Sequence, residues 1–144
     1  MNESLYEIDY YAWTQRQVEL IKKRRWEELD LDNLLEELEE MGKSSKRTLE
    51  SRLEILFMHL LKWQFQSENR SNSWKASILE QRRKLGKLLK ENPSLKPKLA
   101  DIVSEVYEDA RISASKETNL PLNAFPEVMP FTYEQATNPH FWPQ

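Results

Sequence analysis

The longest proline-free stretch in the sequence, residues 31–66, has the apolar spacing of a single long helix. Its apolar residues recur at steps of three and four, which places them on one face of an α-helix. They are Leu31, Leu34, Leu35, Leu38, Met41, Leu49, Leu53, Leu56, Leu60 and Trp63. At about 1.5 Å per residue, roughly 36 residues span on the order of 54 Å. We therefore predict a long helix that continues through Gly42, with a bend there because glycine weakens a helix.

A single all-α domain over residues 1–144 is the expected architecture. The chain has 144 residues, 39% of them hydrophobic and 31% charged, which suits one core better than two. Only two glycines are present, and strongly alternating β-branched segments and Asn-Gly turns are missing, so little material remains for hairpins. We predict a bundle of about four helices around the long one.

Three further helices are predicted, over residues 9–24, 73–91 and 95–117. Ser73 can cap the second of them, and Pro97 is tolerated in the first turn of the third. The remaining residues, 119–144, hold five of the seven prolines together with many large apolar side chains. Disordered tails are poor in such side chains, so we predict an ordered strap across the bundle.

The sequence excludes several kinds of site. It has no cysteine, which rules out disulfides and thiolate metal ligands, and no glycine-rich phosphate loop. It lacks the paired Glu-x-x-His motifs of di-iron bundles. No apolar run approaches the roughly 20 residues that cross a bilayer, and residues 1–10 lack a signal-peptide pattern. We expect a cytoplasmic protein without cofactor, metal or membrane association.

The formal net charge of −3 hides three blocks of opposite sign. Residues 1–42 carry 5 Lys and Arg against 12 Asp and Glu, residues 43–98 carry 14 against 5, and residues 99–144 carry 2 against 7. Neighbouring helices of opposite charge can simply neutralise each other, and this interpretation needs no function.

A nucleic-acid-binding surface is the sharper interpretation of the basic block. Lysines and arginines that share a face can hold a phosphate backbone. The candidates are Arg83, Lys87 and Lys90 on one helical face, joined by Lys46, Arg70 and Lys75. Arg82, by contrast, falls among apolar positions, so we predict a partly buried arginine paired with a carboxylate. The carboxylate candidates are Glu36, Glu37 and Glu40.

Arg52 and His59 lie seven residues apart, and so on the same face of the long helix. This spacing is similar to the active-site motif of the HEPN ribonucleases, which are also small helical proteins. The resemblance implies that His59 acts as acid or base at a ribose hydroxyl and that Arg52 stabilises phosphate charge, without a metal. The alternative is structural: Arg52 pairs with a glutamate, and His59 is a hydrogen-bonded histidine near the core.

Several short motifs, spread over nearly the whole chain, together resemble the bacterial domain-of-unknown-function family 29. They are residues 9–13 (DYYAW), 27–37 (EELDLDNLLEE), 51–64 with HLLKW at 59–63, 70–74 (RSNSW), 92–95 (NPSL), 107–110 (YEDA) and 141–143 (FWP). The resemblance implies an uncharacterised, all-helical, single-domain protein and assigns no catalytic or binding residue.

The function that we expect from the sequence is that of a small protein-interaction module with a protein partner. The surplus length of the long helix also leaves a homodimer open, because an apolar stripe beyond the bundle needs cover. Nucleic-acid binding and an RNA-cleaving enzyme that uses Arg52 and His59 remain the alternatives.

Overall fold

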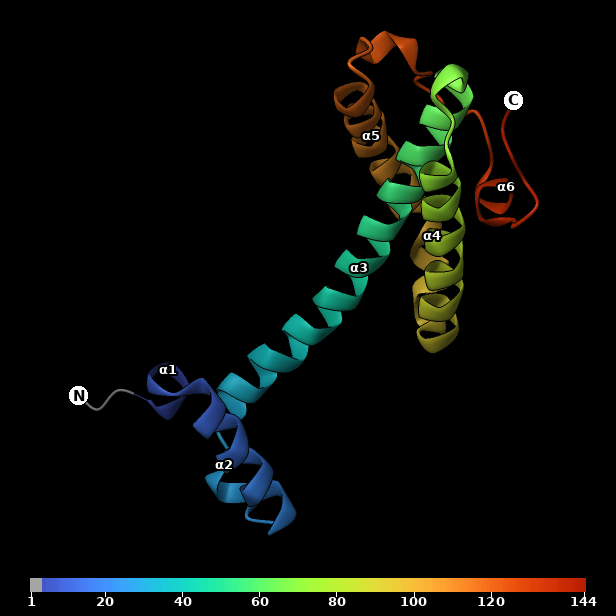
Figure 1. The fold of residues 1–144 in the computed structure, drawn as a ribbon. Coiled ribbons are helices and arrows are strands. Elements are labelled where there is room, and N and C mark those ends of the chain that lie inside the picture. The colour runs from blue at the N-terminus through green and yellow to red at the C-terminus, as the bar shows by residue number, and fades with distance from the viewer. Residues whose placement is uncertain (1–3) are drawn as a thin grey trace. The chain divides into compact units, whose positions relative to one another are not determined.

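The computed structural model describes residues 4–144, in which all regular structure is helical (Figure 1). Helices account for 79% of the structure, and no strand occurs in the described range. The predicted all-α fold is therefore confirmed. The α-helices are α1 (Leu5–Ile8), α2 (Tyr10–Lys22), α3 (Leu31–Phe65), α4 (Asn72–Glu91), α5 (Leu99–Thr118) and α6 (Tyr133–Thr137).

Two compact units make up the chain: an N-terminal unit, Met1–Ser44, and a C-terminal unit, Ser45–Gln144. The long helix α3 contributes residues to both, and its helical conformation continues through Gly42, as predicted. It ends one residue earlier than the predicted range of 31–66. The single domain over residues 1–144 stays a prediction.

In the N-terminal unit, α2 buries only Trp13, Gln17 and Leu20. Asp9 caps this helix, because its carboxylate accepts a hydrogen bond of 3.0 Å from the amide of Ala12. The indole of Trp13 packs edge-on against Tyr6, with ring centroids 4.7 Å apart. An interior of three side chains is small for a unit of this length.

The end of α2 is set by backbone geometry. Arg24 adopts the left-handed conformation with φ of 58°. Its amide bonds to the carbonyl of Ile21, and the next amide, of Arg25, reaches back to Leu20, which is a Schellman motif. Helix α2 therefore stops at Lys22, two residues before the predicted boundary.

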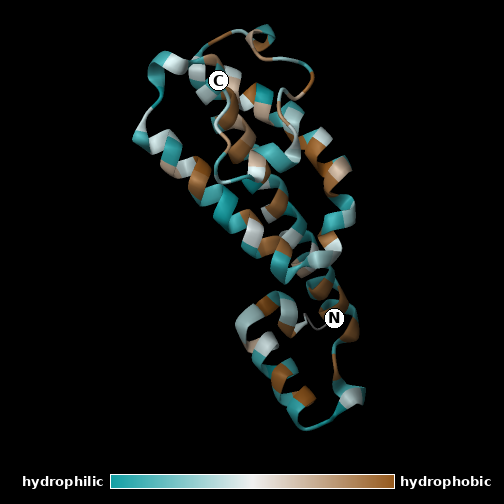
Figure 2. Ribbon diagram, turned by 90° about the vertical axis from the view of Figure 1, so that its right-hand side faces the viewer, coloured by the Kyte–Doolittle hydropathy of each residue, from teal (hydrophilic) through white to brown (hydrophobic). Residues whose placement is uncertain are grey.

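The C-terminal unit holds the main core, which is formed by the second half of α3 together with α4, α5 and residues that follow α5. Figure 2 shows hydrophobic and hydrophilic residues alternating along these helices, as expected for helices with one buried face. The fully buried side chains of α3 are Leu49, Leu53, Leu56, Phe57, Leu60 and Leu61, and they meet Ile78 and Leu85 of α4. Burying each such side chain contributes about 1.5–3 kcal/mol.

Helix α5 begins at Leu99 and not at residue 95. Residues Pro93–Lys98 instead form a 3-10 helix that contains Pro97. Proline disfavours the α conformation at the residue before it, here Lys96, so the regular helix starts only after the proline. Sequence periodicity could not reveal this delay.

Helix α4 begins at Asn72, and Ser71 is its cap in place of the predicted Ser73. The hydroxyl of Ser71 accepts a hydrogen bond of 3.2 Å from the amide of Trp74. Ser73 already lies inside the first turn, where its side chain is exposed. Only the hydroxyl of Ser71 faces an amide of the first turn, which would otherwise lack a hydrogen-bond partner.

Substituting Ser71 with alanine is expected to destabilise the C-terminal unit by about 1 kcal/mol, the usual cost of losing a serine cap. Hydrogen exchange at the α4 amides of the full chain measures this cost. Ser73→Ala is the matched control and should change the stability by less than about 0.5 kcal/mol. Equal losses from both variants would contradict the assignment of the cap.

Residues 119–144 supply three side chains to the core: Phe125, Phe131 and Ala136. Thr132 and Gln135 form a capping box at the start of α6. Each of these two residues bonds the backbone amide of the other, at 3.0 and 2.9 Å. A single strap over the whole segment stays a prediction.

Candidate functional site

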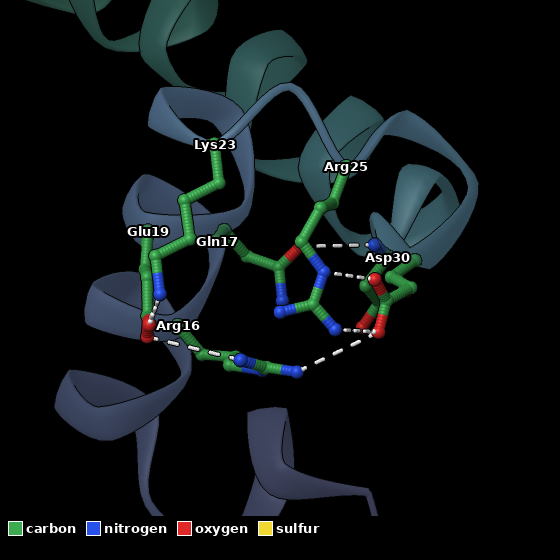
Figure 3. Close-up of polar contacts among 7 residues, drawn as sticks. Arg16, Gln17, Glu19, Lys23, Arg25 and Asp30 are labelled. Atoms are coloured by element: carbon green, nitrogen blue, oxygen red, sulfur yellow. Dashed lines mark hydrogen bonds and ion pairs between the residues drawn. The ribbon is translucent and has the colours of Figure 1, made fainter.

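Asp30 and α2 position the first turn of α3 in the N-terminal unit. One carboxylate oxygen of Asp30 accepts a 2.9 Å hydrogen bond from the indole nitrogen of Trp13. The backbone amide of Asp30 donates to the side-chain oxygen of Gln17, also at 2.9 Å (Figure 3). Asp30 caps α3 by accepting a hydrogen bond of 3.4 Å from the backbone amide of Asn33. A second bond of 2.8 Å, donated by the side-chain amide of Asn33, holds the pKa of Asp30 below its usual value. The start of α3 is thereby tied to the buried residues of α2.

The basic run at the end of α2 is occupied by ion pairs with nearby glutamates (Figure 3). Lys23 lies 2.7 Å from Glu19, and Arg25 pairs with Glu28. Arg16 lies 3.7 Å from Glu19 and 3.8 Å from Glu28. All these side chains are exposed, so water and salt screen each pair and its contribution to stability is small. Glu19 and Glu28 thus neutralise part of the positive charge at this helix end.

Three leucines of α3 point away from the interior of the N-terminal unit, and we call them the leucine stripe: Leu31, Leu35 and Leu38. They are 66%, 58% and 63% exposed. Their spacing of four and three residues places them on one face of the helix. The sequence assigns them the same apolar pattern as the fully buried leucines farther along α3. In the structure these three leucines in the first half of α3 are exposed, whereas those in the second half are buried.

A row of carboxylates runs beside the leucine stripe. Asp32, Glu36 and Glu39 each follow a stripe leucine by one residue, about 100° farther around the helix, and all three are exposed. The opposite edge differs, because there Glu37 accepts a hydrogen bond from the hydroxyl of Tyr6. This bond raises the pKa of Tyr6 to about 12 and lowers the pKa of Glu37. The stripe is thus acidic along one edge.

Exposed apolar side chains are concentrated in the N-terminal unit. Among residues 4–144, sixteen large apolar side chains are exposed, and eleven of them belong to this unit. Isolated exposed apolar residues are normal, but so many of them in one small unit favour an interaction surface. Besides the leucine stripe, the group comprises Leu5, Ile8, Tyr10, Tyr11, Val18, Ile21, Trp26 and Met41.

Arg52, one member of the pair with nuclease-like spacing, contacts α4. Its guanidinium donates a 3.2 Å hydrogen bond to the side-chain oxygen of Gln81. It also lines a cavity together with Lys84 and Lys87, and His59 does not line that cavity.

His59 lies half-buried near α5. Its Nδ1 is 2.9 Å from the carbonyl of Ile55, which can only accept, so Nδ1 carries a proton. Burial lowers the pKa of His59, and the nearby Lys62 acts in the same direction. Lys62 is itself buried, 3.3 Å from Glu117 and over the ring of Trp74 at 4.6 Å. Arg52 and His59 therefore have different neighbours, and their joint catalytic role stays a prediction.

The basic residues predicted as one patch lie in different surroundings. Arg83 and Lys87 line a common cavity on α4, whereas Lys46 and Lys90 do not line it. Arg83 and Lys87 are four residues apart, so both lie on one face of α4. Their role in binding nucleic acid stays a prediction.

Arg70 and Lys75 lie instead beside two tryptophans of the C-terminal unit. Trp63 and Trp142 have ring centroids 4.8 Å apart. The guanidinium of Arg70 is 5.0 Å from the Trp63 ring, and Lys75 is 5.6 Å from the Trp142 ring. Arg70 also donates to the carbonyls of Trp63 and Pro143. Three of the motifs that carry the family resemblance, those containing Trp63, Arg70 and Trp142, meet here.

Arg82 is buried, as predicted, but its partners are backbone carbonyls. Its Nε donates to Ala136 at 2.8 Å and its Nη2 to Phe141 at 2.7 Å. The Trp142 ring lies 5.2 Å from the guanidinium, and Nη1 has no partner in the described part of the chain. The prediction that a carboxylate of Glu36, Glu37 or Glu40 pairs with Arg82 is therefore wrong.

Arg111 is a second buried arginine, which the sequence pattern did not predict. It donates to the carbonyls of Leu122 and Phe125. A basic residue directly after a buried apolar position, here Ala110, is the only signal that could have revealed it. Arg82 and Arg111 together anchor the residues that follow α5.

Within residues 4–144, no group of three or more histidine, aspartate or glutamate side chains is placed to hold a metal ion. None of the described helices is long and apolar enough to cross a membrane.

Comparison with known proteins gives one match. Residues 5–142 match the family described as Domain of unknown function DUF29. No curated protein and no solved structure matches the chain. The match covers almost all of the sequence and agrees with the motifs that resemble this family. The chain therefore belongs to the family Domain of unknown function DUF29.

Proposed function

We propose that the protein is an interaction module whose N-terminal unit binds an amphipathic helix of a partner protein. The observation that carries this proposal is the exposure of the leucine stripe, 58–66% for each leucine, in a unit that buries only Trp13, Gln17 and Leu20 among its residues 4–44. A helix laid against the stripe would cover apolar side chains that the unit itself leaves exposed. Amphipathic helices bind apolar faces through residues at the same three- and four-residue spacing.

The chemistry of the partner follows from the row of Asp32, Glu36 and Glu39. A helix packed on the leucine stripe places the flank of its apolar face against these carboxylates. Lysine or arginine at those flanking positions would be attracted, whereas glutamate would be repelled. We therefore assign the partner helix a leucine-rich face with a basic flank.

A second copy of the same chain fits this surface less well. An antiparallel pair centred on Leu38 joins leucine to leucine but sets Glu36 opposite Glu40, so like charges face each other. Shifting the pair until Glu39 meets Lys43 and Glu36 meets Lys46 places Leu38 opposite Ser44. The first register keeps the leucine contact and loses the charge pairing, and the second keeps the charge pairing and loses the leucine contact. This favours a different protein as the partner.

A labelled synthetic helix with leucines at helical spacing and lysines elsewhere tests the proposal by fluorescence anisotropy with the full chain. The double variant Leu35→Ser/Leu38→Ser should bind it at least about tenfold more weakly, since burying one leucine contributes about 1.5–3 kcal/mol and tenfold corresponds to about 1.4 kcal/mol. Both leucines are exposed, so the folded structure should survive, as circular dichroism would verify.

Ile112→Ser is the matched control, because Ile112 lies in the C-terminal unit and is 57% exposed, like Leu35. It should leave the affinity unchanged. Equal weakening by Ile112→Ser, or unchanged binding by the double variant, would overturn the assignment of the surface. A dimer in light scattering that the double variant abolishes would replace the partner protein by a second copy.

A further inference from the structure

A groove on the exposed face of α4 is basic, whereas the row of carboxylates beside the leucine stripe is acidic. One cavity of about 670 Å³ is lined by Ala76, Leu79, Glu80, Arg83, Lys84 and Lys87. A second cavity of about 300 Å³ shares Lys84 and Lys87 with the first and adds Arg52, Thr48, Leu88 and Glu91. Both cavities lie within the C-terminal unit and share Lys84 and Lys87, and we call them together the α4 groove.

Cations outnumber carboxylates in the α4 groove by four to two. Glu80 hydrogen-bonds Lys84 at 2.5 Å, and Glu91 lies 4.0 Å from Lys87. Arg83 makes no ion pair with any residue that the structure describes. The groove therefore retains positive charge after its internal pairs are counted, and Arg83 is the cation best placed to receive an external carboxylate.

The floor of the larger cavity is apolar. Leu79 is 41% exposed there and lies next to Ala76. Ala76, Leu79, Arg83 and Lys87 follow each other at three- and four-residue steps, so apolar and basic side chains form one line along the helix. A ligand that fills this groove needs an apolar group for the floor and anionic groups for its basic end.

We propose that the α4 groove binds an acidic amphipathic helix of a protein partner. A leucine-like side chain of that helix packs on Ala76 and Leu79, and carboxylates one turn farther along pair with Arg83 and Lys87. Glu80 already accepts a hydrogen bond from Lys84 and would repel a nearby carboxylate. The acidic side chains of the partner helix can be placed so that none lies opposite Glu80.

Nucleic acid fits the groove less well. A continuous row of phosphates would meet Glu80 and Glu91 as well as the cations. Neither cavity is lined by an aromatic side chain on which bases could stack. The partly exposed Trp63 and Trp142 occur elsewhere, beside cations that hold the chain's own C-terminal residues.

The proposal is independent of the one made for the leucine stripe. The two surfaces belong to different units, carry opposite charge and require ligands of opposite charge. A variant at one surface can therefore be tested against the ligand of the other, and either proposal can fail alone.

The test uses fluorescence anisotropy of the full chain with a labelled synthetic helix that has leucines at helical spacing and glutamates elsewhere. The double variant Arg83→Glu/Lys87→Glu should bind at least about tenfold more weakly, and the affinity of the native chain should fall with added salt. The same variant should bind the lysine-containing helix as the native chain does. Both residues are exposed, and circular dichroism would verify the fold.

Lys96→Glu/Lys98→Glu is the matched control, with the same change of net charge on exposed lysines of the Pro93–Lys98 segment, outside the groove. It should retain the affinity for the acidic helix. Three results would each overturn the proposal: no binding by the native chain, equal binding by Arg83→Glu/Lys87→Glu, or tighter binding of a single-stranded or duplex RNA than of the acidic helix.

Discussion

Arg82→Met should lower the stability of the C-terminal unit by about 3 kcal/mol, because each buried carbonyl left without a donor costs about 1–3 kcal/mol. The guanidinium supplies two such donors, to Ala136 at 2.8 Å and Phe141 at 2.7 Å. Methionine fills a similar volume but donates no hydrogen bond. It also removes the cation beside the Trp142 ring. Hydrogen exchange at the α4 and α5 amides of the full chain measures the loss.

The neighbouring Arg83 provides the control for this prediction. Arg83 is exposed and makes no ion pair within the described range, so Arg83→Met should change stability by less than about 0.5 kcal/mol. Arg82→Lys keeps the charge but offers a single nitrogen for two carbonyls, and it should fall between Arg82→Met and the native protein. Similar losses for Arg82→Met and Arg83→Met would show that hydrogen bonding to the C-terminal residues contributes little.

Phe57→Ala should cost the same unit about 3–5 kcal/mol, the usual range for removing a buried aromatic side chain. Phe57 is fully buried in the second half of α3, and its ring centroid lies 6.0 Å from that of Phe131. The cavity left by the ring would be bordered by helix α3 and by the residues after α5, which cannot collapse without moving backbone. Hydrogen exchange at the same amides reports this loss.

Phe65→Ala, in the last residue of the same helix, is the matched substitution. Phe65 is 37% exposed and touches Phe125 with ring centroids 5.9 Å apart. Its removal should cost about 1 kcal/mol, mostly the edge-to-face contact. If both alanine variants lost the same stability, burial on α3 would not control the energetics of the core as we argue.

The two proposed surfaces give the family member a consistent physical description. The N-terminal unit is poor in buried side chains and rich in exposed ones, whereas the C-terminal unit has a complete core and a charged groove. We propose that the first recognises a basic amphipathic helix and the second an acidic one. Binding experiments with the two synthetic helices and the two double variants separate these roles.

Local interactions explain why the sequence predicts most helices well. The long helix was predicted over 31–66 and spans Leu31–Phe65, because its apolar spacing and its lack of proline act within a few residues. The capping box of Thr132 and Gln135 is equally local. The start of α4 was predicted at residue 73 with Ser73 as the cap, which is wrong by one residue, because any serine at a helix start is a good cap by its residue type. Only the backbone path decides which hydroxyl meets the amide of Trp74.

The candidate sites depended on contacts that no local pattern contains. Arg52 and His59 share a helical face by spacing, yet one contacts Gln81 of α4 and the other lies near Glu117 of α5. Arg82 was correctly expected to be buried, but its acceptors lie 54 and 59 residues away in the sequence. Every residue has a backbone carbonyl, so residue types cannot show which carbonyl will accept from a buried arginine. The sequence therefore favoured glutamates as partners.

The periodicity of α3 shows most clearly where sequence determines the structure and where it does not. Leucines recur at three- and four-residue steps in both halves of the helix, and this alone determined that a helix with one apolar face forms. Which leucines are buried was decided by tertiary structure: Leu53 and Leu60 are covered, whereas Leu31 and Leu38 are exposed. Burial requires another segment opposite the face, and periodicity carries no information about that segment.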